Sequence, residues 1–153
     1  MNGKIILTSI LILLSASLCY AQTTSKKDAA QNGLPKIINQ AKNTPAYAEL
    51  LLRRTERESE LEEFLLNYTE EFPKVKELKF ELDLLKKEMD KVVAVSASEA
   101  GKLTLALGKL IVRKTELETD VWNLKRQYSE DHPEVKRARR KVEVYDKAIK
   151  EIL

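Results

Sequence analysis

Two stretches of the sequence place apolar residues at alternating intervals of three and four positions, each directly after a proline. The first stretch follows Pro73 and the second follows Pro133. Their apolar positions are Val75, Leu78, Leu82, Leu85, Met89 and Val92 in the first, and Val135, Ala138, Val142, Tyr145, Ile149 and Ile152 in the second. This spacing is the a/d pattern of helices that pack along a narrow seam, so it predicts one helix in each stretch.

The apolar stripes that precede the two prolines predict the partner helices. The stripe residues are Leu50, Leu61, Phe64 and Tyr68 before the first proline, and Leu103, Leu107, Leu110, Leu117, Val121, Leu124 and Tyr128 before the second. Folding each segment back at its proline sets Leu61 beside Leu82 and Val121 beside Val142. The sequence therefore predicts two helical hairpins with coiled-coil-like seams.

The two hairpins repeat each other with an offset of 60 residues. Residues 68–76 read YTEEFPKVK, and residues 128–136 read YSEDHPEVK. The same offset aligns four earlier residues, Arg53, Thr55, Glu56 and Glu58, with Arg113, Thr115, Glu116 and Glu118. We therefore expect an all-α protein of two tandem hairpins, residues 44–95 and 96–153.

Where the hairpins join, the apolar stripe widens to residues 50–52 in one hairpin and residues 110–112 in the other. A two-helix seam does not need this width, so we expect the hairpins to pack on each other as an antiparallel four-helix bundle. Ser96 followed by Glu99 fits a capping box, which predicts that one helix ends near Val95 and the next begins there. One continuous helix is the alternative, because no proline interrupts the segment.

The N-terminal residues have the pattern of a secretory signal peptide. Lys4 precedes an apolar run over residues 5–18, and small residues then allow a cut after Ala21. We interpret residues 1–21 as a cleaved signal and residues 22–43 as a flexible polar leader. The protein is then periplasmic or secreted, and it is membrane-anchored if the signal is not cleaved.

The composition points away from catalysis. One third of the residues are charged and 6% are aromatic, which is typical of long helices and coiled coils. Cys19 is the only cysteine and leaves with the signal, and His132 is the only histidine, so a metal site lacks ligands. We interpret His132 as a turn residue, at the place that Phe72 takes in the first repeat. The sequence shows no phosphate-binding glycine loop. It therefore predicts no enzyme, no metal and no cofactor.

A basic cluster distinguishes the second hairpin from the first. Its residues are Lys136, Arg137, Arg139, Arg140 and Lys141, and the matching positions of the first repeat, 76, 77, 79, 80 and 81, are mixed in charge. A solvated helix flank is one interpretation. The functional alternative is a site for an acidic partner, an anionic lipid or an acidic polysaccharide. Nucleic acid is not expected, because no aromatic residues interleave the cluster.

Three further residues depart from the pattern around them. Arg54 and Lys114 take equivalent inward positions, which favours stems packed over the seam with the charged heads in water. The alternative is a polar break that specifies register or partner. Trp122 replaces Glu62 of the first repeat, and it is a candidate anchor for a contact between hairpins or between subunits.

The turn over residues 128–136, followed by a heptad helix, resembles the periplasmic coiled-coil hairpins of bacterial polysaccharide co-polymerases, the chain-length determinants. In that family a pattern from Tyr to His-Pro-x-Val turns one long helix into the next. Tyr128, His132, Pro133 and Val135 carry the resemblance here. It covers the hairpin cores and implies a periplasmic hairpin module. It implies no activity, because this sequence shows no counterpart of the family's second membrane helix, α/β base domain or kinase.

These observations predict an exported, non-catalytic interaction or scaffold protein of the bacterial cell envelope. We expect it to associate with itself or with a protein partner through its helices. A periplasmic holdase-type chaperone is the alternative, and the two differ in how much apolar surface they expose.

Overall fold

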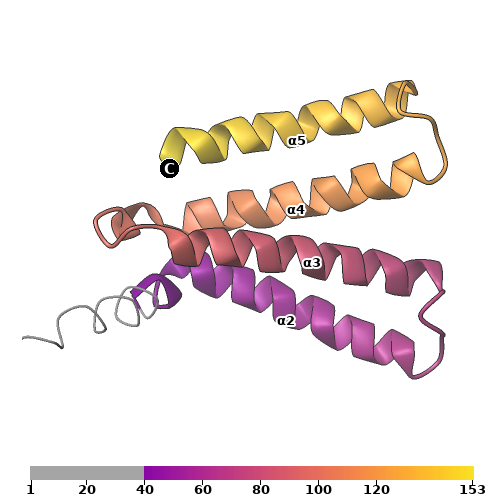
Figure 1. The fold of residues 1–153 in the computed structure, drawn as a ribbon, viewed down its shortest axis with the longest axis horizontal. Coiled ribbons are helices and arrows are strands. Elements are labelled where there is room, and N and C mark those ends of the chain that lie inside the picture. The colour runs from indigo at the N-terminus through magenta and orange to yellow at the C-terminus, as the bar shows by residue number, and fades with distance from the viewer. Residues whose placement is uncertain (1–39) are drawn as a thin grey trace, which may run out of the picture.

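The computed structural model describes residues 40–153, and over this range it is helical without a strand. The elements are α2 (Pro45–Leu65), α3 (Pro73–Ala94), the short 3-10 helix η1 (Ala100–Lys102), α4 (Leu105–Lys125) and α5 (Pro133–Ile152). Successive α-helices run in opposite directions, and both turns lie at the same end of the molecule (Figure 1). The prediction of an all-helical protein is confirmed. The predicted signal, 1–21, and the predicted leader up to residue 39 lie outside the described residues.

The two turns have the same backbone hydrogen bonds. The amide of Tyr68 donates to the carbonyl of Phe64 at 2.9 Å, and the amide of Tyr128 donates to the carbonyl of Leu124 at 2.8 Å. Four residues later, the amides of Phe72 and His132 donate to the carbonyls of residues 69 and 129, each at 3.0 Å. The 60-residue sequence repeat is therefore also a repeat of structure.

An aromatic pair closes each turn before the proline that begins the next helix. The rings of Tyr68 and Phe72 stack with centroids 4.1 Å apart, and those of Tyr128 and His132 stack at 4.2 Å. His132 also caps α5, because its Nδ1 accepts a hydrogen bond from the amide of Glu134 at 3.3 Å. These contacts confirm His132 as a turn residue.

The predicted start of the third long helix at Ser96 is wrong. Ser96 Oγ does bind Glu99 Oε2 at 3.0 Å, but the chain then continues through a turn and the short helix η1 rather than as an α-helix. Helix α4 begins after Thr104, whose Oγ1 accepts from the amide of residue 107 at 3.3 Å. Thr44 caps α2 through the amide of residue 47 in the same way, at 3.4 Å. The 60-residue offset aligns Thr104 with Thr44 and therefore indicated the correct start of α4. The capping-box pattern at Ser96 did not.

The apolar core lies at the end of the molecule where α2 and α4 begin. Its buried members are Ala41, Ala46, Leu50, Leu85, Met89, Val92, Leu103, Leu107, Ile111 and Ile149. Ala41 belongs to the predicted flexible leader, yet it is buried here. The predicted wide stripe is buried only in part, because Leu50 and Ile111 are inside whereas Leu51 and Leu52 are exposed.

Helices α2, α3 and α4 pack against one another, whereas α5 packs mainly against α4. The parallel helices α2 and α4 are in close contact at Gly108. A Cβ added there would lie 2.9 Å from the Cα of Ala46 and from the Cβ of Glu49, so only glycine allows this approach. The amide of Ala46 also donates to the carbonyl of Leu103 at 3.2 Å. The two hairpins are thus held together at the end opposite their turns.

Candidate functional site

A buried ionic cluster joins three helices around Lys114 of α4. Its Nζ lies 3.2 Å from Glu88 of α3, 3.3 Å from Asp146 of α5 and 3.6 Å from Glu118 of α4. Lys114 is 8% exposed, so the interpretation that places its charged head in water is wrong. The alternative, a polar break that specifies which helices pack together, fits this geometry.

The charges of this cluster shift one another's pKa values. Burial by itself lowers the pKa of Lys114, but Glu88 and Glu118 outweigh that effect and the pKa is raised. Burial raises the pKa of Glu118 above its usual value, although Lys114 opposes the shift. Lys114 is therefore held in its charged form, and its ammonium group contacts carboxylates from three helices.

A second ionic contact links the hairpins through Arg53 of α2. Its guanidinium lies 3.0 Å from Glu81 of α3 and 2.8 Å from Glu116 of α4. Glu81 is buried, so this pair is shielded from water. Beyond the apolar core, ionic contacts on Arg53 and Lys114 therefore join the hairpins.

Nearer the turns, Trp122 of α4 forms the contact between hairpins that its sequence position suggested. Its ring stacks on Phe80 of α3 with centroids 4.9 Å apart, and Arg126 lies 4.7 Å from the ring centroid. Beside it, Asn123 donates to Glu77 of α3 at 2.7 Å. The interpretation of Trp122 as an anchor between the hairpins is confirmed.

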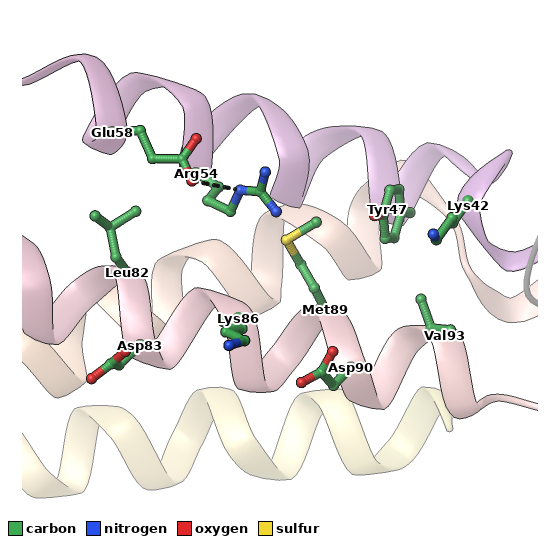
Figure 2. Close-up of a pocket in the computed structure, with 10 residues that line it drawn as sticks. All are labelled: Lys42, Tyr47, Arg54, Glu58, Leu82, Asp83, Lys86, Met89, Asp90 and Val93. Carbon is green, nitrogen blue, oxygen red and sulfur yellow. Dashed lines mark ion pairs between the residues drawn. The ribbon is translucent and has the colours of Figure 1, made fainter.

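An open groove of about 400 Å³ runs between α2 and α3 (Figure 2). The ion pair between Arg54 and Glu58, 3.0 Å long, lies along its α2 side. The lining residues are Lys42, Tyr47, Arg54, Glu58, Leu82, Asp83, Lys86, Met89, Asp90 and Val93. The groove mixes three cations and three carboxylates over an apolar floor, and it has no single charge preference.

The predicted basic cluster lies along α5. Arg139 is half-buried and binds Glu130 at 2.7 Å, so its ion pair joins α5 to the turn that precedes it. Arg139 and Lys125 together lower the pKa of Glu130 to about 2. Lys136 pairs with Asp131 at 3.1 Å and Arg137 pairs with Glu134 at 2.9 Å, on the surface.

Arg140 and Lys141, in contrast, are exposed and have no ion-pair partner within 4.0 Å among the described residues. Lys147 is a further exposed cation on this side, which sequence reasoning missed. Its position one heptad after Arg140 was the available signal. The basic surface of α5 is therefore longer than the predicted cluster and partly unpaired.

Within residues 40–153, no group of three or more His, Cys, Asp or Glu side chains is arranged to hold a metal ion. No helix in the same range is long and apolar enough to cross a bilayer. No protein-family model matches the sequence, and no curated protein or solved structure matches it either. The described residues thus offer helix surfaces and open grooves as candidate sites.

Proposed function

We propose that this protein is an exported, non-catalytic interaction protein of the bacterial cell envelope, which works through the surfaces of its helical hairpins. The observation that carries the proposal is the exposed basic side of α5. This helix packs mainly against α4, so it is the least covered of the four α-helices. Its unpaired cations, Arg140 and Lys141, are available to an acidic partner.

A comparison of the two repeats supports the use of this surface for binding. The counterparts of Arg140 and Lys141 in the first repeat are Phe80 and Glu81. Phe80 stacks on Trp122 of the second hairpin, and Glu81 binds Arg53, which in turn binds Glu116 of the second hairpin. The same face of the repeat is thus a contact surface in α3 and an open surface in α5.

The location in the periplasm or outside the cell rests on the signal-like residues 1–21. The likeness of the second turn to the periplasmic hairpins of polysaccharide co-polymerases supports the same location. We further infer that the two hairpins act as one antiparallel four-helix unit. The cluster on Lys114, which draws carboxylates from α3 and α5, supports this inference.

Binding to acidic surfaces tests the function. The protein should bind phosphatidylglycerol vesicles, an acidic polysaccharide or an acidic protein, and binding should weaken as salt rises, because the Debye length falls from about 10 Å at 0.1 M to about 3 Å at 1 M. The triple variant Arg137→Glu, Arg140→Glu, Lys141→Glu should lose this binding.

The matched control is Lys86→Glu, Lys87→Glu, Lys125→Glu on α3 and α4. Its three side chains are also exposed, and one of them, Lys125, is paired with a surface carboxylate as Arg137 is. It should bind as the unaltered protein does. If the two triple variants lose binding equally, only net charge matters and the α5 surface is not a site. Export is tested separately, because periplasmic protein should begin at Gln22.

A further inference from the structure

The face of α4 that receives the first hairpin has a counterpart on α2 that no residue of 40–153 covers. Between Gly108, which meets Ala46, and Trp122, which stacks on Phe80, this face of α4 buries three side chains. They are Ile111, Thr115 and Thr119. Sixty residues earlier, α2 carries Ala48, Leu51, Thr55, Ser59 and Glu62, all exposed.

The two faces have the same order of small, aliphatic and hydroxyl residues, but only one is covered. Ile111 is 2% exposed, whereas its counterpart Leu51 is 39% exposed. Thr115 is fully buried, and its counterpart Thr55 is exposed. The face on α2 lacks a cover because no hairpin precedes it in the described chain.

The opposite side of the molecule carries the complementary surface. The residues of the first hairpin that meet α4 are Ala46, Glu49, Arg53, Glu77, Phe80 and Glu88, and Glu81 joins them through Arg53. Their counterparts in the second hairpin are Ala106, Lys109, Arg113, Arg137, Arg140, Ala148 and Lys141. All of these are exposed except Ala148, which is half-buried. The second hairpin therefore has a docking face on which no segment of the described chain is docked.

We propose that the protein assembles head to tail, with the second hairpin of one copy bound to α2 of the next copy as the first hairpin binds α4 within the chain. The inference rests on the proposed function, because it names a second copy as the partner of the α5 surface. The two faces differ, so the contact is heterologous. It extends into a filament or closes into a ring, depending on the rotation between copies.

The internal contacts predict the register between copies, and the charges agree with it. The pair Phe80–Trp122 becomes Arg140 with Glu62 of the next copy. The pair Glu77–Asn123 becomes Arg137 with Glu63 of the next copy.

The contact of Arg53 with Glu81 and Glu116 becomes Arg113 and Lys141 with Glu56 of the next copy. All three acidic residues on α2 are exposed. In both pairs and in this triad, therefore, cations of the second hairpin meet carboxylates of α2.

The distribution of charge between the hairpins favours the same contact. Residues 45–94 hold 9 basic and 13 acidic residues, for a net charge of −4, and residues 105–152 hold 12 basic and 9 acidic residues, for a net charge of +3. Unlike hairpins therefore attract each other, and like hairpins repel each other. Ala48 takes the place of Gly108, so the copies are expected to sit wider apart by about one methyl group at that end.

Sedimentation velocity on the protein as recovered from cells tests the proposal. At low salt, species larger than one chain should grow with protein concentration, and 1 M salt should reduce them. The variant with Arg137, Arg140 and Lys141 changed to Glu should have an association constant about tenfold lower, because attractive charge pairs become like-charge pairs. The variant with Glu56, Glu62 and Glu63 changed to Lys should be equally weakened. The control variant at Lys86, Lys87 and Lys125, which lie outside the proposed contact, should associate normally.

Mixing the two weakened variants gives the decisive result. Each then meets the opposite charge on the other, so mixed assemblies should form at concentrations at which neither variant assembles alone. A chain that stays monomeric at low salt overturns the proposal, and so does a mixture that fails to assemble although the unaltered protein assembles.

A crosslink checks the register. In a Cys19→Ser background, Ala48→Cys and Ala106→Cys replace the counterparts of the contact between Gly108 and Ala46, and oxidation should give a ladder of disulfide-linked chains. Assembly without a ladder overturns the register.

These outcomes separate the inference from the proposed function. If the Glu56, Glu62 and Glu63 variant still binds acidic vesicles while the protein never self-associates, the α5 surface serves another partner. If the Arg137, Arg140 and Lys141 variant changes neither vesicle binding nor assembly, the proposed function itself fails.

Discussion

At the scale of single residues, Lys114 shows how one charge can select a packing arrangement. The a/d pattern places it inward, and carboxylates from α3 and α5 meet it there. Removing one partner from a buried ionic contact is costly because the remaining charges stay buried without compensation. Arg54, at the same place in the first repeat, meets only Glu58 of its own helix among the described residues.

We therefore expect Lys114→Met to lower the free energy of unfolding by about 3 kcal/mol at neutral pH. The folded-state pKa of Lys114 lies above 10.5, so its contribution is complete below that pH and is lost only above it. In the variant, Glu118 is left beside Glu88 and Asp146 without the charge of Lys114, and burial already raises the pKa of Glu118 above 4.5. The deficit should thus shrink as the pH falls toward about 4.5 and Glu118 becomes neutral, measured in denaturant titrations.

The control is Arg54→Met, which should cost less than about 1 kcal/mol, because its ion pair is exposed. Equal losses in the two variants would show that Lys114 has no special role.

Gly108 gives a second prediction at this scale. Alanine favours a helix over glycine by about 1 kcal/mol, so Gly108→Ala would stabilise an isolated α4. In the protein, the new Cβ would meet the backbone of Ala46 at 2.9 Å, and overpacking of this kind costs about 1–3 kcal/mol. We expect a lower thermal midpoint. Gly101→Ala, where no atom lies within 4 Å, should leave it unchanged.

At the scale of elements, the seams predicted from the heptads are confirmed in α3 and α5. Every predicted seam position is buried or half-buried. This could be read from the sequence because hairpin seams depend on local periodicity and on a turn that the proline marks.

The capping of α4 by Thr104 could also have been read from the repeat. The docking of α2 on α4 through Gly108 could not, because a/d spacing does not say which side of a hairpin meets another hairpin. The partners of Lys114 were hidden for the same reason, since they come from other helices.

The depth of each seam position sets the cost of truncating it. Leu85 is fully buried in the apolar core, so Leu85→Ala should cost about 3 kcal/mol or more. Leu82 and Val142 are half-buried, so Leu82→Ala and Val142→Ala should cost about 2 kcal/mol or less. Urea titration of the three variants checks this order. A larger loss at Leu82 than at Leu85 would contradict the assigned core.

At the scale of the whole molecule, the position of apolar surface distinguishes an interaction protein from a holdase. The large apolar side chains that stay exposed in the described chain are spread over several elements rather than gathered on a concave face. They are Leu51, Leu52, Leu66, Tyr68, Leu105, Tyr128, Val144 and Leu153. A holdase needs a contiguous apolar surface for unfolded clients.

We therefore expect no suppression of client aggregation at an equimolar ratio, measured by light scattering of a heat-denatured client. Strong suppression at that ratio would favour the chaperone alternative over the proposed function.

Because the apolar core lies at one end, the two hairpins are joined mainly at that end, and their turns lie far from it. Helix α2 has 21 residues and is about 31 Å long. A rotation of about 10° at the core end would therefore move a turn by about 5 Å, given that length. Such a movement would act on the contacts between the hairpins outside the core, which are the stacking of Trp122 on Phe80 and the polar contacts Asn123–Glu77, Arg53–Glu116 and Lys114–Glu88. A small rotation between the hairpins at the core end therefore produces a larger displacement of their turns.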